Sequence, residues 1–214
     1  MPHFQTLLML IIPILMALTI HEYSHGWAAW RLGDPTARVS GRLTLNPLAH
    51  LDPIGTVMLF LFYFGWAKPV PVNMMNFRRP LRDMALVAIA GPVSNILLAA
   101  ALGILTQWLI VADLLTPYGL SYRILTLGVF INLMLAFFNL LPIPPLDGAK
   151  VVGGLLPKQW GWVWMRMERW GALFLLGIIL LGQFSGVPIF SRLIFPLSQY
   201  FYHLFTGGMP LMVS

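Results

Sequence analysis

The chain of 214 residues is 58% hydrophobic and only 9% charged, and its mean hydropathy is +0.80. This composition excludes an ordinary soluble domain, since such domains carry about 25% charged residues. The net charge of +6 is spread over short loops and helix ends, and the chain has no cysteine. We therefore exclude a basic nucleic-acid-binding surface, disulfides and thiolate metal sites, and expect contacts with membrane lipid instead.

The first predicted helix covers residues 4–32 and stops at the turn formed by Gly33 and Pro35. Its N-terminal flank lacks the basic residues of a signal peptide, and no small-residue cleavage site follows, so we expect a helix of the mature protein. Basic residues come directly after it, at Arg31, Arg38 and Arg42. By the positive-inside rule, the far end of this helix is cytoplasmic.

A cluster of ionisable residues follows the apolar part of this helix, in the order His21, Glu22, Tyr23, Ser24, His25. Histidines four positions apart share one helix face, so both imidazoles can bind one Zn²⁺ while Glu22 lies beside the metal-bound water. The alternative is a chance pattern of hydrogen-bonded core histidines. Lipid cannot solvate such groups, so ionisable residues at membrane depth favour the functional interpretation.

Two irregular segments follow. Residues 37–46 alternate, with Val39 and Leu43 on one side, which predicts an exposed edge strand. Residues 65–73 contain Pro69 and Pro71, which enforce an extended backbone. Such backbone occurs at membrane depth only where it is buried in protein or lines a wet cavity.

Further apolar stretches predict the remaining spans, at residues 81–114, 120–141, 173–184 and 189–205. Residues 54–64 are apolar but short, as expected of a broken or tilted helix. Tryptophans at positions 160, 162 and 164 resemble an interfacial aromatic belt. We therefore predict an all-α membrane protein, a single domain over residues 1–214 with five to six transmembrane helices and a small strand or re-entrant element near the active site.

A catalytic zinc needs a third protein ligand. The carboxylates and histidines outside the HExxH pattern are Asp34, His50, Asp52, Asp83, Asp113, Asp147, Glu168 and His203. Most lie beside turns or basic residues, where capping or ion pairing accounts for them. Asp147 follows a proline cluster between apolar segments, and the next residue, Gly148, permits close backbone approach. We favour Asp147 because an unpaired carboxylate is costly to bury there.

Two histidines and one aspartate would leave the fourth position of one zinc ion per chain open to water. Glu22 would take the proton of that water and later pass it to a leaving amine. Asn95 lies inside an apolar run and is a candidate donor to the oxyanion. Amide hydrolysis is the reaction that this set suits best.

These motifs resemble the site-2 proteases, which are intramembrane zinc metalloproteases. The family pattern HExxHG matches residues 21–26, and its Asn-x-x-Pro…Leu-Asp-Gly signature matches residues 139–148. Residues 41–48 and 91–95 are similar to its two intervening motifs. The resemblance implies zinc ligands at His21, His25 and Asp147, a general base at Glu22, and support or substrate contact by Asn95 and Asn139.

The resemblance also implies the substrate, a single-span membrane protein already cut by another protease. Residues 38–46 and 68–73 would hold it by strand addition, with contacts from Val39, Leu43, Pro69 and Val70. It further implies a multi-pass protein of a bacterial or archaeal cell membrane with its active site toward the cytoplasm. No PDZ-like or CBS-like module is visible, as expected of a short form, and nothing in the sequence indicates the oligomeric state.

Two other functions are consistent with the HExxH pattern. A metal transporter or structural zinc protein would use the histidines without hydrolysis, but transporters repeat their polar motifs in two halves, whereas each motif occurs once here. A structural site would also have no use for Glu22. A prenyl-protein peptidase would share HExxH but gives no reason for the Leu-Asp-Gly signature.

Overall fold

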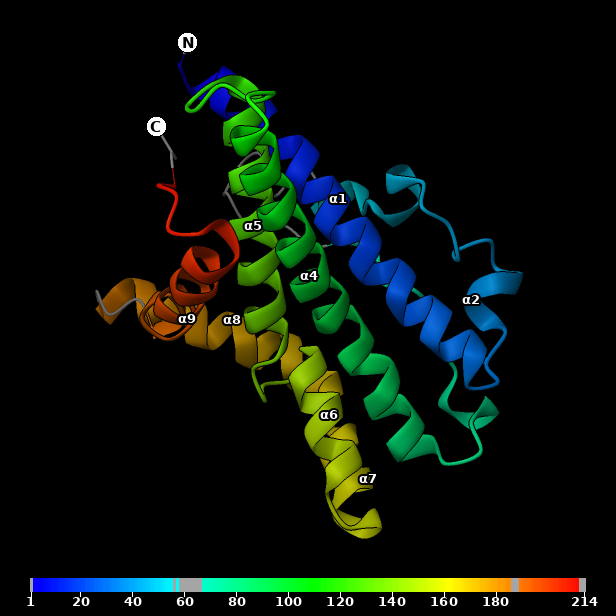
Figure 1. Ribbon diagram of the computed structural model, residues 1–214. Helices are drawn as coiled ribbons and strands as arrows, with labels where there is room; N and C mark the ends of the chain where they lie inside the picture. Colours follow the sequence, from blue (N-terminus) through cyan, green and yellow to red (C-terminus); the bar gives the residue numbers. More distant parts are fainter. Residues whose placement is uncertain (1, 56, 58–66, 186–188, 212–214) are drawn as a thin grey trace.

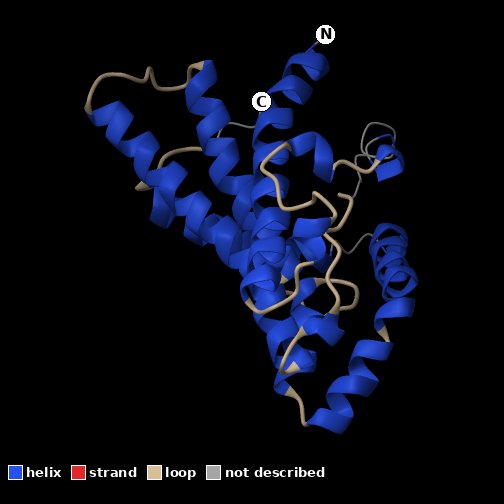
Figure 2. Ribbon diagram, turned by 90° about the vertical axis from the view of Figure 1, so that its right-hand side faces the viewer, coloured by secondary structure: helices blue, strands red, loops and turns tan. Residues whose placement is uncertain are grey.

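The computed structural model describes residues 2–55, 57, 67–185 and 189–211, and within these ranges the regular structure is helical (Figure 1; Figure 2). Three long helices dominate: α1 (Pro2–Arg31), α4 (Pro80–Val111) and α5 (Leu120–Asn139). The shorter elements are α2 (Thr36–Val39), η1 (Pro47–His50), η2 (Met74–Asn76), α6 (Asp147–Leu155), α7 (Lys158–Arg166), α8 (Glu168–Ser185) and α9 (Ile189–Thr206). The predicted all-α class is thus confirmed for the described residues.

Helix α4 is the centre of the packing. It contacts α1, α5 and α6, and Figure 1 shows α1, α4 and α5 side by side. Small residues occupy the buried faces of these helices, among them Ala17, Ala99 and Gly128. Such residues allow helix backbones to approach closely. Helix α9 covers the other side of α5, where Tyr202 joins a buried cluster with Val129.

Helix α6 starts just after the turn that follows α5 (Figure 1). The proline-rich turn at residues 142–145 separates the two helices, and Asp147 is the first residue of α6. Gly148 lies directly against the carbonyl groups of Leu140 and Leu141, so closely that a side chain would collide with them. This turn therefore presents Asp147 toward α1 and α4.

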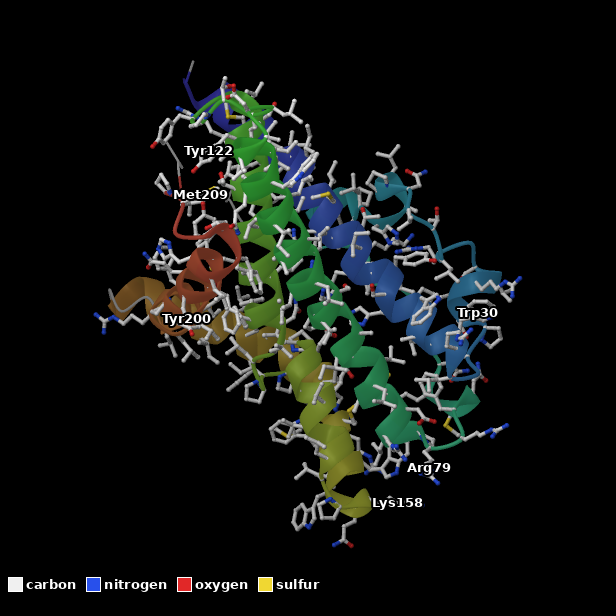
Figure 3. All side chains as sticks on the ribbon, in the orientation of Figure 1. Trp30, Arg79, Tyr122, Lys158, Tyr200 and Met209 are labelled. Atoms are coloured by element: carbon white, nitrogen blue, oxygen red, sulfur yellow. The ribbon has the colours of Figure 1, made fainter. Side chains whose placement is uncertain are left out.

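Two described helices are long and apolar enough to cross a membrane, Pro80–Val111 with a hydropathy of 2.1 and Leu120–Asn139 with 1.7. Charged and aromatic side chains lie toward the ends of the long helices, as the labelled Trp30, Arg79 and Tyr122 illustrate (Figure 3). Arg38 lies over the Trp30 ring, 4.9 Å from its centroid. These features agree with a membrane protein.

The predicted strand at residues 37–46 is wrong. Thr36–Val39 forms one helical turn, and Gly41, with φ 67°, then reverses the chain. The alternation of apolar residues does not mark a buried face, because Val39 is 82% exposed. A helical turn forms here instead of a strand because the Asp34 carboxylate accepts a hydrogen bond from the Thr36 N–H at the start of the turn.

Residues 68–73 are not helical, as predicted, and have no regular structure; Asn73 at their end has an extended backbone. They follow an antiparallel bridge between Leu51 and Ala67. The segment at 54–64 falls largely outside the described residues.

Candidate metal centre

Three buried side chains from two helices meet beside α4. His21 and His25 lie one turn apart on α1, and Asp147 begins α6. The Nε2 atoms of the two histidines are 3.0 Å apart. Asp147 Oδ2 lies 3.1 Å from each of them. The structure thus brings together the three predicted ligands, and their donor atoms lie within 4.8 Å of one another.

Backbone and amide oxygens determine which imidazole nitrogens carry the protons. His25 Nδ1 donates to the carbonyl oxygen of Val87 at 2.8 Å, and His21 Nδ1 donates to Asn95 Oδ1 at 2.6 Å. In a neutral imidazole the other nitrogen then has only a lone pair. Both Nε2 lone pairs and a carboxylate oxygen therefore point into one small space, an arrangement that a cation stabilises.

This donor set fits zinc. Histidine nitrogens and a carboxylate oxygen are ordinary zinc ligands, and three of them leave one position free for water. The partners on the two Nδ1 atoms are those that orient metal-binding histidines in general. Gly91 provides the space, because a Cβ there would lie 2.5 Å from His25 Nε2 and 2.7 Å from His21 Cε1.

Glu22 lies half-buried beside this group. Its Oε2 accepts the backbone N–H of Val70 at 2.9 Å. We call residues 67–77 the strap, because this segment runs along α1 and is attached to it at several points. The Val70 side chain packs on Gly26, where a Cβ would lie 3.2 Å from Val70 Cγ1 and 3.4 Å from Leu43 Cδ1. The glycine of the HExxHG pattern thus lets the strap approach α1 closely.

Most backbone N–H groups of the strap that were predicted to bind substrate already donate hydrogen bonds within the protein. Of the four backbone N–H donors in residues 68–73, three have partners in the structure. Lys68 donates to the His50 carbonyl, Val70 to Glu22, and Asn73 to Asp34 Oδ2 at 2.7 Å. Strand addition through these N–H groups therefore requires the strap to release them.

The other predicted contact residues are placed differently. Leu43 and Val70 lie together at Gly26, whereas Val39 is exposed on α2. Pro69 is exposed, and its carbonyl accepts from Arg42 at 3.4 Å. Asn139, the last residue of α5, donates to the Leu135 carbonyl one turn earlier.

Both N–H groups of the Asn95 amide have hydrogen-bond partners within the protein. One N–H of its amide donates to the Ala17 carbonyl at 3.0 Å, and the other donates to Asn132 Oδ1 at 2.7 Å. Its oxygen faces His21. These contacts fit the support role that the family resemblance implies for Asn95, and a donor role toward an oxyanion would require one of the two N–H bonds to be released.

Four of the other candidates for a third ligand have hydrogen-bond partners of their own. Asp34 holds the strap, and His50 donates to the Thr44 carbonyl. Asp52 accepts from Gly55 N, and Asp83 caps the start of α4 by accepting from Arg79 N. Among described residues, only the His21, His25 and Asp147 group could hold a metal ion.

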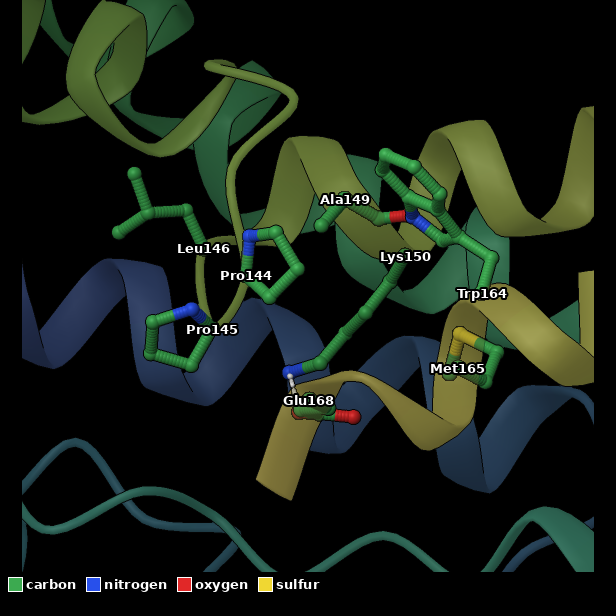
Figure 4. Close-up of a pocket in the computed structure, with 8 residues that line it drawn as sticks. All are labelled: Pro144, Pro145, Leu146, Ala149, Lys150, Trp164, Met165 and Glu168. Carbon is green, nitrogen blue, oxygen red and sulfur yellow. Dashed lines mark hydrogen bonds and ion pairs between the residues drawn. The ribbon is translucent and has the colours of Figure 1, made fainter. Parts of the chain in front are cut away.

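A small pocket lies on the side of α6 that faces α7 and α8 (Figure 4). Its lining consists of Pro144, Pro145, Leu146, Ala149, Lys150, Trp164, Met165 and Glu168. Lys150 Nζ lies 3.4 Å from Glu168 Oε1 and 3.9 Å from Asp147 Oδ1. The ammonium group thus faces the carboxylate oxygen that is turned away from the histidines.

Sequence reasoning missed Gly91 and Asn132 as parts of the site. Asn132 carries the same signal as Asn95, an amide inside an apolar helix, and could have been found by it. Gly91 belongs to the family motif at residues 91–95, but only the relative placement of α1 and α4 reveals that it faces the imidazoles.

Comparison with known proteins agrees with this geometry. The profile of peptidase family M50 matches residues 113–169. YwhC of Bacillus subtilis, which is named as a zinc metalloprotease, is 36% identical over 88% of this chain and 84% of its own length. Rip2 of Mycolicibacterium smegmatis, named likewise, is 31% identical over 94% of this chain and 74% of its own.

A third relative is the stage IV sporulation protein FB of B. subtilis, which is 30% identical over 67% of this chain and 50% of its own length. No solved structure matches the chain. The extent of the similarity to YwhC and Rip2 confirms the resemblance found in the motifs. The chain therefore belongs to peptidase family M50, the site-2 protease family of membrane-bound zinc metalloproteases.

Proposed function

We propose that the chain is an intramembrane zinc endopeptidase that hydrolyses peptide bonds within or near transmembrane segments of membrane proteins. His21, His25 and Asp147 bind one zinc ion. The observation that carries the proposal is the convergence of two Nε2 atoms and Asp147 Oδ2, at 3.0 to 3.1 Å, in a buried space. Repulsion between such groups is relieved by a cation, and the family membership identifies it as zinc.

Zinc, when bound, supplies a Lewis acid that brings the pKa of a water molecule toward about 7. Glu22 follows His21 on α1, and its carboxylate takes the proton from that water. The same carboxylate then delivers the proton to the amine that leaves. The bond from Val70 N–H to Glu22 Oε2 leaves Oε1 as the oxygen for proton transfer.

The substrate is a single-span membrane protein, pre-cleaved by another protease. Support comes from the burial of the site among apolar helices and from the family, whose members act on membrane proteins. A helical substrate hides its amide carbonyls in hydrogen bonds, so it must unwind before attack. Leu43, Pro69 and Val70 would contact the unwound segment near Glu22.

The apolar helices and the basic residues at their ends support a placement in the membrane. We propose a single multi-pass domain over residues 1–214 with five to six spans, among them α4 and α5, which are long and apolar enough to cross a membrane. Basic residues lie at or after the end of α1, at Arg31 and Arg38, and directly before α4, at Arg78 and Arg79. This end is cytoplasmic by the positive-inside rule, so the active site lies toward the cytoplasm.

Replacing the general base tests the proposal. We expect Glu22→Gln to keep zinc and to lose about 10²- to 10⁴-fold in cleavage rate, the usual contribution of general acid–base catalysis. Zinc content is measured by metal analysis, and cleavage by mass spectrometry on reconstituted single-span proteins. Glu168→Gln makes the same chemical change on the partly exposed Glu168 and should cleave like wild type. Unchanged cleavage by Glu22→Gln would show that Glu22 is not the general base, whereas zinc bound by a wild type that cleaves nothing would indicate structural or transported metal.

A further inference from the structure

Two buried asparagines form a hydrogen-bonded chain that ends at His21. Asn132 on α5 and Asn95 on α4 are both 0% exposed. Asn132 Nδ2 donates to the Gly128 carbonyl at 2.8 Å, and Asn95 Nδ2 donates to Asn132 Oδ1 at 2.7 Å. His21 Nδ1 then donates to Asn95 Oδ1 at 2.6 Å. The chain thus connects α5, through α4, to the metal centre on α1.

Two backbone carbonyls determine which group donates and which accepts in each of these hydrogen bonds between Asn132, Asn95 and His21. A carbonyl oxygen can only accept, so Asn132 must turn its NH₂ group toward Gly128 and its oxygen toward Asn95. In the same way, the Ala17 carbonyl takes one N–H of Asn95. The Asn95 oxygen therefore faces His21, and the proton of that imidazole must be on Nδ1.

The opposite orientation of Asn95 would harm metal binding. With its amide reversed, the NH₂ group would face His21 Nδ1 and favour the proton on Nε2, the atom that faces Asp147. The reversed Asn95 oxygen would then meet the oxygens of Ala17 and Asn132 without any hydrogen between them. Leaving buried polar groups unpaired is unfavourable, so Asn132 adds to the penalty against reversal.

We propose that Asn132 is a positioning residue of the metal centre, which keeps His21 in the Nδ1–H form by accepting a hydrogen bond from Asn95. This rests on the proposed function insofar as His21 is a zinc ligand. Asn132 reaches the centre only through Asn95. A purely structural Asn132 would join α4 to α5 and would have no effect on zinc affinity.

The test compares zinc affinities of the full chain in detergent, measured by competition with a chromophoric chelator. Asn132→Leu removes the acceptor at similar volume, and we expect about a tenfold loss, the low end of the effect of outer residues that orient metal ligands. Asn132→Asp keeps an acceptor for Asn95, so its affinity should stay closer to wild type than to Asn132→Leu. In zinc-free protein, ¹⁵N resonances of His21 should show the Nδ1–H form in wild type and a mixture in Asn132→Leu.

Thr126→Val is the matched control. Thr126 is also 0% exposed on α5, and its hydroxyl donates to the Tyr122 carbonyl at 2.9 Å. Its replacement removes a buried polar group that is not part of the hydrogen-bonded series from Asn132 to His21, so zinc affinity should stay at the wild-type value. If Asn132→Leu does not fold, Asn132→Ala takes its place under the same criteria.

Wild-type affinity in Asn132→Leu with an unchanged His21 resonance would overturn the proposal, as would an equal loss in Thr126→Val. These outcomes differ from a failure of the proposed function. In that case the wild type itself would bind no zinc, or His21→Ala would bind it as tightly as wild type, and the role of Asn132 would fall with it.

Discussion

At the scale of single residues, the smallest side chain of the site imposes the strictest limit. Gly91 on α4 faces both imidazoles, and the nearest atom to an added Cβ would be His25 Nε2 at 2.5 Å. Real Cβ atoms essentially never approach other atoms so closely, and the rings cannot retreat because their Nδ1 atoms are held by Val87 and Asn95. Position 91 therefore tolerates only glycine if the histidines are to bind metal.

We expect Gly91→Ala to lose zinc binding while the helices still assemble, because alanine is favourable in a helix. Chelator competition measures the affinity, and circular dichroism measures the helix content. Gly177→Ala on α8 is the control, since nothing lies within 4 Å of the added Cβ there. Zinc affinity equal to wild type in Gly91→Ala would contradict the placement of the imidazoles against α4.

The sequence could predict the metal ligands because each carries a local signal. The spacing of His21 and His25 places them on one helix face, and Asp147 stands out among prolines in an apolar region. The resemblance implied a supporting role for Asn95, but which atom of its amide faces His21 could not be predicted, because an amide can donate or accept. Only the Ala17 carbonyl, contributed by another helix, shows that its NH₂ group is turned away from the site.

At the scale of elements, Asp34 connects the end of α1 to the strap. It is 0% exposed and accepts hydrogen bonds from Thr36, from Asn73 N at 2.7 Å and from Asn76 Nδ2 at 2.6 Å. Burial alone would raise the pKa of Asp34, but the hydrogen bonds from Thr36, Asn76 and Asn73 outweigh it and lower that pKa below its ordinary value.

The attachment of the strap should therefore weaken as the pH falls. A carboxyl group whose pKa is lowered by folding contributes stability above its unfolded pKa of about 3.9, and that stability is lost as the pH falls through the folded value. We expect hydrogen-exchange protection of residues 73–76, corrected for intrinsic exchange, to fall at pH below about 4. The zinc-free protein is used so that metal loss does not contribute.

Asp34→Asn should show low protection at neutral pH, since its NH₂ group would face the N–H donors of the strap, and little further change in acid. Asp113→Asn, at the far end of α4, should behave like wild type. Equal protection in Asp34→Asn and wild type at neutral pH would contradict this account of the attachment.

Long elements could be predicted from the sequence, whereas the short segment at residues 37–46 could not. The long apolar helices were predicted to within a few residues, because their length and composition suffice. The strand at residues 37–46 was wrong because its alternation came without burial, and a hydrogen bond from Thr36 to Asp34 favoured a helical turn. The structure of a short segment depends on hydrogen-bond partners outside it, and the periodic pattern of its own residues does not reveal them.

At the scale of the whole molecule, the metal centre joins parts of the chain that lie far apart in sequence. His25 and Asp147 are contributed by α1 and α6, and Gly148 packs α6 against the end of α5. A cation bound by these residues cross-links α1 and α6, which both pack against α4. Binding to the folded chain but not to the unfolded chain raises the free energy of unfolding by mass action.

We therefore expect zinc to raise the melting temperature of the full chain. At a free zinc concentration of 100 times Kd the gain is about 2.7 kcal/mol, which corresponds to about 5–10 °C for a protein of this size. Asp147→Ala should melt at the same temperature with and without zinc, whereas Asp113→Ala should keep the full shift. A shift of wild-type size in Asp147→Ala would mean that zinc stabilises the fold elsewhere, because removing one of three ligands must weaken a site that all three complete.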